Sequence, residues 1–321
     1  MLRYLQEDSV LSIVIPKGVV RMAADNREYK DRLFNFLFGS EENKAWTLSL
    51  YNAVNGSDYT DPSAIEITTI QETMYISTHN DISFIIADEM NLYEQQSTYN
   101  PNMPVRMLRY AASLFEKYIV QTKQDPYGRR QMHLPAPQFV VFYNGLENQP
   151  KEKPLKLSDS FPEGAVSDIE VTVRMINVNY GTNPEFLVAC KPLKEYSWLV
   201  NKIREINKIK GNEDIGSAID QAISAMPDDF EIKPFLEMHR AEVKGMLLAE
   251  YNEAEKLALV RDNAWREGQT QGLTEGRAEG RAEGIIDTLI SLVKKNLLST
   301  KDAADQAGIS EAAFTQRMSA K

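Results

Sequence analysis

The sequence predicts an α/β fold, in which a mixed β-sheet is flanked by helices and followed by a helical C-terminal region. The continuous apolar run at residues 139–143 is typical of a central strand that is buried on both faces. Two strand-like segments, 80–86 and 92–96, enclose a polar turn and predict a β-hairpin. Helical spacing of apolar residues precedes and follows these strands, and from about residue 185 the pattern is helical throughout. Strands interleaved with helices favour a layered α/β architecture.

The elements before the hairpin follow from periodicity and end signals. Residues 27–38 predict a helix whose buried face carries Leu33, Phe34, Leu37 and Phe38. Ser40 is a candidate N-cap for a second helix, which should stop at Asn55-Gly56. Segments 65–70 and 74–77 have strand composition and lead into the hairpin.

The elements after the hairpin include a long amphipathic helix opened by Pro101 and Pro104. Its predicted core face carries Val105, Leu108, Ala112, Phe115 and Ile119, and the opposite face carries Arg106, Arg109 and Lys117. Residues 146–165 predict a Pro- and Lys-rich loop. Residues 169–175 alternate apolar and polar side chains, which predicts a half-exposed strand.

Composition limits the possible classes of protein. The chain has 321 residues, 43% of them hydrophobic, which is enough for a full core. Its one cysteine, Cys190, excludes an internal disulfide, and its three histidines show no zinc spacing. No segment has the pattern of a signal peptide or a membrane span, so we expect a cytoplasmic protein without membrane contacts.

The formal net charge of −10 argues against a protein that binds nucleic acid through its overall charge. Local cationic candidates exist on the long helix, at Arg106, Arg109 and Lys117, and in the loop that follows, at Lys123, Arg129 and Arg130. For each of these residues a solvated surface charge is the simpler interpretation.

The predicted hairpin carries the main candidate site. It can bring the carboxylate of Asp81 next to that of Glu94, because a hairpin sets residues of its two strands side by side. Glu94 and Gln96 are two residues apart and share a face of their strand. Two carboxylates and a third polar group can hold a hard divalent cation such as Mg²⁺, which activates water and stabilises charge on a phosphate. Solvated acids beside a turn are the alternative interpretation.

Several segments in the same order resemble the recombination-promoting nuclease and transposase family (the Rpn family) of the PD-(D/E)XK nuclease superfamily. They are DRLFNFLFG at 31–39, LSLYNAV at 48–54, Asp81 with Glu94-x-Gln96, and RMLRY at 106–110. The resemblance covers roughly residues 25–320, and the order and spacing of the motifs make it specific. It departs from the common pattern at Gln96, where the superfamily usually has lysine, and at Asn35, where the family commonly has lysine.

The resemblance implies a restriction-endonuclease-like core and a Mg²⁺-dependent DNA endonuclease linked to recombination or mobile elements. Asp81 and Glu94 would bind the divalent cation, and Gln96 would position water or a phosphate oxygen. Asp31 would contribute from the first helix or act as a structural residue. Arg106 and Tyr110 would face the phosphate backbone or brace the hairpin. We expect the two carboxylates to be exposed, so that replacing either by alanine abolishes cleavage without unfolding the chain.

The predicted organisation has five parts. They are an N-terminal arm at 1–24, a nuclease core at 25–205, a helical region at 206–264, a glycine-repeat helix or linker at 265–284, and a helix-turn-helix-like tail at 285–321. In the repeat, glycine stands at every fourth position from Gly268 to Gly284. This stripe suits either close packing against another helix, giving a homo-oligomer, or a weakly helical linker.

In the tail, Ser299, Gly308 and Ser310 mark two capped helices separated by a turn. This pattern suits a DNA reader or a helical cap for oligomerisation. For the whole chain, two further possibilities are open. One is a catalytically weak DNA-binding and oligomerising protein of the transposon or phage-defence type, and the other is a purely structural assembly protein.

Overall fold

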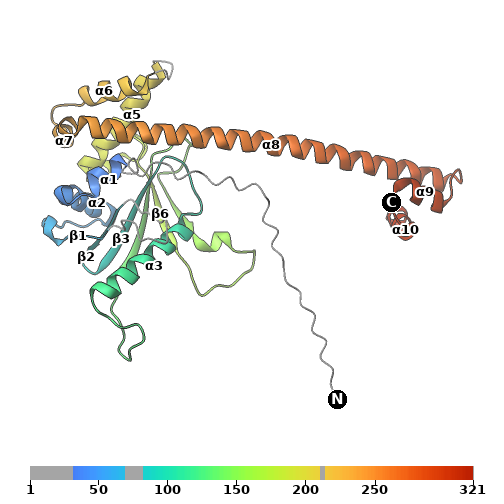
Figure 1. The fold of residues 1–321 in the computed structure, drawn as a ribbon, viewed down its shortest axis with the longest axis horizontal. Coiled ribbons are helices and arrows are strands. Elements are labelled where there is room, and N and C mark those ends of the chain that lie inside the picture. The colour runs from blue at the N-terminus through green and yellow to red at the C-terminus, as the bar shows by residue number, and fades with distance from the viewer. Residues whose placement is uncertain (1–31, 69–81, 210–213, 321) are drawn as a thin grey trace. The chain divides into compact units, whose positions relative to one another are not determined.

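A computed structural model describes residues 32–68, 82–209 and 214–320, and the chain forms two compact units, Met1–Tyr251 and Asn252–Lys321. The first unit contains a six-stranded mixed sheet with the order β1-β2-β3-β4-β6-β5 and helices packed on both faces (Figure 1). The predicted α/β class, with a mixed sheet flanked by helices, is therefore confirmed.

The sheet combines a parallel centre with antiparallel edges. Its strands are β1 Glu66–Ile67, β2 Ile82–Ile86, β3 Glu89–Gln96, β4 Ala136–Tyr143, β5 Glu152–Lys156 and β6 Thr172–Asn177. Strands β3, β4 and β6 are parallel neighbours, whereas β1, β2 and β5 pair antiparallel. The carboxyl ends of three parallel strands therefore meet at one edge of the sheet, which is where open α/β sheets bind ligands.

Strand β4 is the central strand that the apolar run predicts. Val141 and Tyr143 pack into the core on one face of the sheet, and Val140 and Phe142 pack into the core on the other. A strand that is buried on both faces has no room for alternating polar residues, which explains the unbroken apolar run.

The predicted hairpin is confirmed, but its turn is shorter than expected. Only Ala87 and Asp88 form the turn, with φ of 50° and 61°, and β3 begins directly at Glu89. Two central residues with positive φ fit the type I′ turn, whose twist matches that of the strands. The resulting register pairs Ile82 with Tyr93 and Ile86 with Glu89.

One face of the sheet is covered by most of the helices. They are α1 Leu33–Phe38, α2 Lys44–Asn55, α4 Pro184–Ala189, α5 Lys191–Ile209, α6 Ile215–Ser224, α7 Lys233–Met238 and the first turns of α8 Arg240–Lys294. Phe34 lies at the centre of this core, in contact with Phe38, Phe142 and Tyr196.

Most of the predicted helix ends on this face are confirmed. The four apolar residues predicted for the first helix are fully buried in α1, whereas residues 27–31 lie outside the described part of the chain. Gly56 ends α2 in the left-handed conformation, with φ of 63°. The predicted N-cap of the second helix was wrong: Asn43 is the N-cap residue of α2, and Ser40 precedes a one-turn 3₁₀ helix, Glu41–Asn43, without making a side-chain capping hydrogen bond.

The other face of the sheet is covered by α3, Met103–Gln121. The predicted core face of this helix was wrong for most of its residues, because the buried stripe runs through Met103, Met107, Tyr110 and Leu114, and of the predicted residues only Phe115 packs against this core. This stripe adjoins Arg106, which forms an ion pair with the buried Glu94 of β3. Packing the predicted face on the sheet would have left Glu94 buried without its cation, and that is far more costly than exposing aliphatic side chains.

Three strand predictions need correction. The segment 146–165 was predicted as a loop, but it contains the edge strand β5, in which Pro154 is tolerated because an edge strand need not donate every hydrogen bond. The alternating strand begins at Thr172 rather than at residue 169, and Ile169 is exposed. Of segment 65–70, only Glu66–Ile67 forms a strand among the described residues, and 74–77 lies outside them.

The second unit contains the rest of α8, with α9 Thr300–Ala307 and α10 Glu311–Ser319. The predicted caps are confirmed: the Ser299 and Ser310 side chains accept hydrogen bonds from the Asp302 and Ala313 backbone N–H groups. Gly308 makes the turn with φ of 66°. A small core joins the three helices, formed by Ile286, Leu289, Ile290, Ala303, Ala304 and Phe314.

The unit boundary lies within α8, at 251/252. Helices α6 and α7, which the sequence assigned to a separate region from residue 206, belong to the unit that contains the sheet. Within the described ranges, no helix combines the length and the apolarity that crossing a membrane requires.

Candidate functional site

The candidate site lies at the carboxyl end of β3. Glu94 and Gln96 point to the face of the sheet that α3 covers, the same face as Met90 and Leu92. Both polar side chains are buried, with exposures of 3% and 6%. The shared face that their spacing predicts is therefore present, but the expected exposure of the Glu94 carboxylate was wrong.

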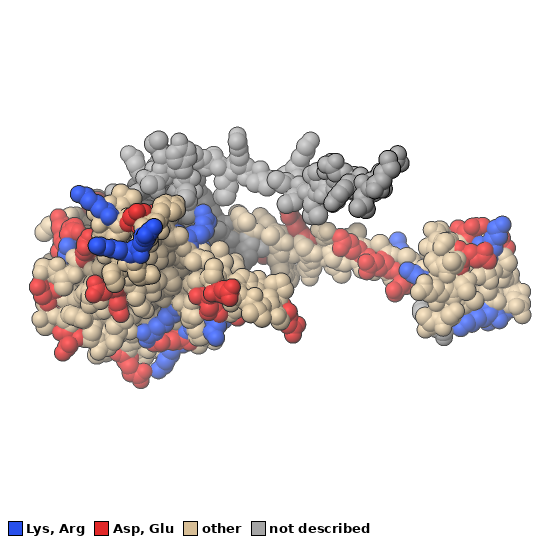
Figure 2. Space-filling model, turned by 90° about the horizontal axis from the view of Figure 1, so that it is seen from below, with Lys and Arg blue, Asp and Glu red and all other residues tan. Residues whose placement is uncertain are grey.

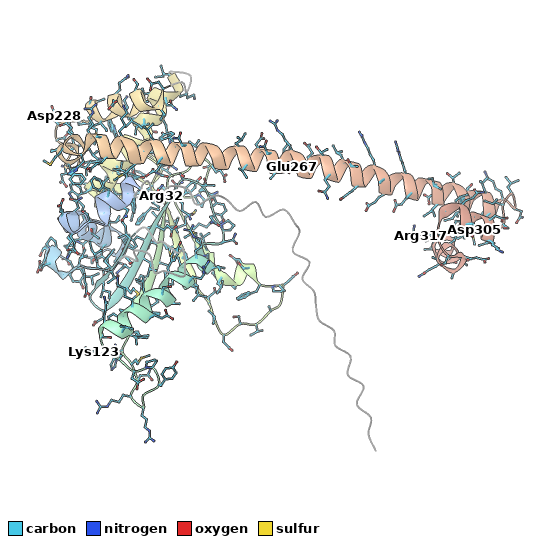
Figure 3. The ribbon with its side chains drawn as sticks, in the orientation of Figure 1. Arg32, Lys123, Asp228, Glu267, Asp305 and Arg317 are labelled. Atoms are coloured by element: carbon cyan, nitrogen blue, oxygen red, sulfur yellow. The ribbon has the colours of Figure 1, made fainter. Side chains whose placement is uncertain are left out.

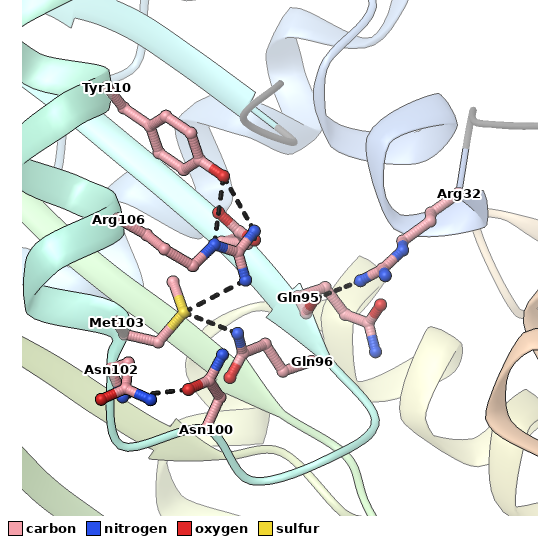
Figure 4. A network of polar contacts seen from close by, with 9 residues as sticks. Arg32, Gln95, Gln96, Asn100, Asn102, Met103, Arg106 and Tyr110 are labelled. Atoms are coloured by element: carbon pink, nitrogen blue, oxygen red, sulfur yellow. Dashed lines mark hydrogen bonds and ion pairs between the residues drawn. The ribbon is translucent and has the colours of Figure 1, made fainter. Parts of the chain in front are cut away.

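Glu94 is held by a cation from α3. The Arg106 guanidinium donates through Nη2 to Oε1 of Glu94. Its Nε and Nη2 also donate to the Tyr110 hydroxyl, at 3.2 and 2.8 Å, and Tyr110 lies one helical turn further along α3. Tyr110 thus orients Arg106 (Figure 4), and Arg106 neutralises Glu94.

Met103, at the start of α3, connects Gln96 to this network. Its sulfur lies 2.6 Å from Nε2 of Gln96 and 3.5 Å from Nη1 of Arg106 (Figure 4). The structure thus brings together four of the predicted elements of the site: Glu94, Gln96, Arg106 and Tyr110. Asp81 and Asp31 lie outside the described residues.

The described residues of this site offer Mg²⁺ the right kind of donor but too few of them. A carboxylate and an amide provide oxygen ligands, which Mg²⁺ prefers. No group of three or more Asp, Glu, His or Cys residues within the described ranges is placed to hold a metal ion. Arg106 also occupies the carboxylate that would bind the cation. A complete metal site at Glu94 would therefore need a further acid in addition to the described residues.

A second polar network, which the sequence analysis missed, lies at the same edge of the sheet on the other face. The Arg32 side chain donates to the Gln95 carbonyl oxygen at 2.6 Å, and the Gln95 side chain donates to Oδ1 of Asn144 at 2.7 Å. Asn144 in turn donates to the Tyr196 hydroxyl at 3.1 Å, and its carbonyl oxygen accepts from Arg204 at 2.5 Å.

Three arginines, Arg32, Arg106 and Arg204, therefore lie around the carboxyl ends of β3 and β4. Asn144 directly follows the buried strand in the sequence, and a polar residue at that position was the signal that could have revealed this network. An edge with several guanidinium groups can attract a phosphate.

Lys117 and the basic residues of the loop after α3 do not join this edge. Helix α3 crosses from the end of β3 to the start of β4, so the loop that follows it lies at the opposite end of the sheet, as Lys123 shows (Figure 3). Lys117 donates to the Thr68 carbonyl oxygen at 3.3 Å. On the face seen in Figure 2, basic and acidic side chains are interspersed, without a continuous basic band among the described residues.

Cys190 offers no nucleophile. It is fully buried, and burial raises the pKa of its thiol to about 11. A thiol with that pKa is almost entirely protonated at neutral pH, and only the thiolate attacks.

Comparison with known proteins found no relative: no family model matches the chain, and no curated protein or solved structure matches it.

Proposed function

We propose that the protein is a Mg²⁺-dependent DNA endonuclease with a restriction-endonuclease-like core. The observation that carries the proposal is the buried pair Glu94 and Gln96, which share one face of β3 at its carboxyl end, at the edge of the sheet. The hairpin register pairs Ile82 with Tyr93. The proposal extends that register by one residue, so that Asp81 faces Glu94 and supplies the second carboxylate.

The chain's residues would divide the work as follows. Glu94 and Asp81 would hold Mg²⁺, which supplies an activated water and neutralises charge on the phosphate. Gln96 would position the water or a phosphate oxygen. Arg106 would leave Glu94 when the cation binds, and its guanidinium, kept close by Tyr110, would bind the scissile phosphate. Arg32 and Arg204 would hold neighbouring phosphates at the same edge.

A second candidate function is a DNA-binding and oligomerising protein with little or no catalysis. The observation that favours it is the ion pair itself, since Arg106 satisfies Glu94 without a metal ion. Gln96 also lacks the positive charge that a lysine would supply. In this case the arginines of the edge would bind phosphate and no bond would be cut.

The deciding experiment compares plasmid nicking by the purified parent protein with nicking by Asp81→Asn and Glu94→Gln, each with and without Mg²⁺. We expect the parent to nick only with Mg²⁺ and both variants to lose at least 100-fold in rate, as expected when a metal ligand is removed. Glu89→Gln, at the far end of β3 where Glu89 accepts from Tyr51, is the matched control. Cleavage by Glu94→Gln at the parental rate would contradict the proposal, and DNA binding without nicking by the parent would support the second candidate.

We also propose that residues 265–298 form a dimerisation arm. Helix α8 continues through all five glycines of the stripe, and all five are exposed. A Cβ built at any of them meets no atom within 4 Å, so nothing within the described chain requires glycine there. Close approach of a second helix would require it.

A further inference from the structure

Helix α3 carries a second apolar stripe, which lies beside its buried face and is most exposed in the first half of the helix; only Phe115 of this stripe also packs against the core beneath α3. It consists of Val105, Leu108, Ala112, Phe115 and Ile119, at alternating spacings of three and four residues. Val105 and Leu108 are 41% and 36% exposed, Ala112 is exposed, and Phe115 and Ile119 are partly buried. Apolar residues at this spacing are typical of the contact line between two packed helices, and here they continue for about four turns.

We propose that this stripe binds α3 of a second copy of the chain, antiparallel and across a twofold axis. The charges beside the stripe select this partner. Arg109 and Glu116 are both exposed and lie seven residues apart along one flank of the stripe. In a symmetric antiparallel pair, Arg109 of each copy lies beside Glu116 of the other, which gives two matched charge pairs.

A parallel pair offers no such match. In a parallel pair, the side of the stripe that carries Arg109 and Glu116 would lie beside the other side of the stripe in the second copy. That other side carries Ala111 and Tyr118. Neither can form an ion pair with Arg109 or Glu116, so the charges favour the antiparallel arrangement.

The sizes of the side chains fit the same register. The arrangement that pairs Arg109 with Glu116 of the second copy also sets Leu108 against Ile119 and Ala112 against Phe115. Each layer occurs twice because of the twofold axis. Placing the smallest residue of the stripe opposite the largest lets the helices pack without voids or overlap.

The short length of the stripe predicts weak association. Residues 105–119 span about 21 Å at 1.5 Å per residue. A helix pair of this length buries less surface than a standard stable interface, so the dimer should form in a concentration-dependent way. This surface is separate from the glycine stripe of α8, and it would contribute to self-association independently of that stripe.

The first test is sedimentation of the full chain over a series of concentrations. Leu108→Lys places a charge in each of the two outer Leu108–Ile119 layers of the seam and should weaken dimerisation by at least about tenfold. Val120→Lys is the matched control, because Val120 is on the same helix and 76% exposed but lies off the stripe. It should associate like the parent.

A charge exchange makes the test specific for the antiparallel pair. Arg109→Glu and Glu116→Arg should each weaken dimerisation about three- to tenfold, because each creates two like-charge contacts, and the double variant should restore it. Circular dichroism should show unchanged helix content, since both side chains are exposed. A monomeric parent, parental association of Leu108→Lys, or a double variant no better than the single ones would overturn the proposal.

Discussion

Glu94 shows how burial changes the meaning of a single residue. As an exposed metal ligand it could be truncated without harm, but in the structure it is a buried carboxylate whose charge is balanced by Arg106. Removing Arg106 would leave this buried carboxylate uncompensated, which costs more than the pair itself contributes. Alanine at Glu94 would instead leave a cavity in the buried site, and would so confound loss of catalysis with loss of stability; the isosteric glutamine is the better probe.

We predict that Arg106→Met destabilises the protein by about 2–3 kcal/mol, less than a fully buried pair would cost because the guanidinium is partly exposed. Adding Glu94→Gln to Arg106→Met should recover part of this loss, since the buried charge is then gone. Urea unfolding of the two single variants and the double variant measures the coupling. Additive effects of the two substitutions would show that the ion pair contributes nothing to stability.

Glu195 provides a second prediction, on pH dependence. Its side chain is buried in α5, where Oε2 accepts from the Ile232 backbone N–H at 3.0 Å. Burial raises the pKa of Glu195 above its ordinary value of 4.5, although the hydrogen bonds from Ile232 and Glu231 oppose this. The folded state therefore binds the proton more tightly than the unfolded state, so this residue's contribution to stability is lost as the pH rises above 4.5 through the folded-state pKa.

Glu195→Gln keeps an acceptor for Ile232 and removes this titration. We expect the free energy of unfolding of the parent, relative to that of the variant, to fall as the pH rises above about 4.5. Urea unfolding at several pH values measures the difference. The exposed Glu185→Gln serves as control, and equal pH profiles for parent and Glu195→Gln would contradict the assignment.

At the scale of elements, the hairpin turn is a place where local sequence and local structure disagree. Type I′ turns favour Asn-Gly, yet Ala87 and Asp88 take up positive φ here because the strands pair directly up to the turn, from Ile82–Tyr93 to Ile86–Glu89. We predict that Ala87→Asn combined with Asp88→Gly raises the free energy of unfolding by about 0.5–1 kcal/mol. Ala165→Asn, at a position without positive φ, should give no such gain in urea unfolding.

The elements that could be predicted are those in which one local signal suffices. The apolar run of β4, the glycine stop of α2 and the serine caps of α9 and α10 needed no knowledge of their neighbours. The buried face of α3 could not be predicted, because the helix has two apolar stripes and only the cation requirement of Glu94 decides between them. The resemblance offered bracing of the hairpin as one role for Arg106, but periodicity alone could not predict its ion pair with Glu94, nor the network of Arg32, Asn144 and Arg204.

At the scale of the whole molecule, the two proposed contact surfaces lie in different units of the chain. The α3 stripe belongs to the unit that contains the sheet, and the glycine stripe lies in the unit that begins at Asn252. A chain that pairs through both surfaces would bring two copies of the proposed site at Glu94 into one assembly. An enzyme that cuts both strands of a duplex needs two such sites. Sedimentation of variants at each surface separates their contributions, because substitutions in different units should act additively.

The last prediction concerns the glycine stripe. Replacing Gly272, Gly276 and Gly280 by alanine meets no steric obstacle within the chain, and each replacement should favour the helix by about 1 kcal/mol. If the stripe only links two parts of the chain, the triple variant should be more helical and associate like the parent. If it is a seam between helices, the three added methyl groups push the helices apart, and association should weaken although each helix is more stable. We expect the second result. Sedimentation of the triple variant, the parent and a truncation ending at Ala264 measures it, and parental association of both altered proteins would show that the stripe is a linker.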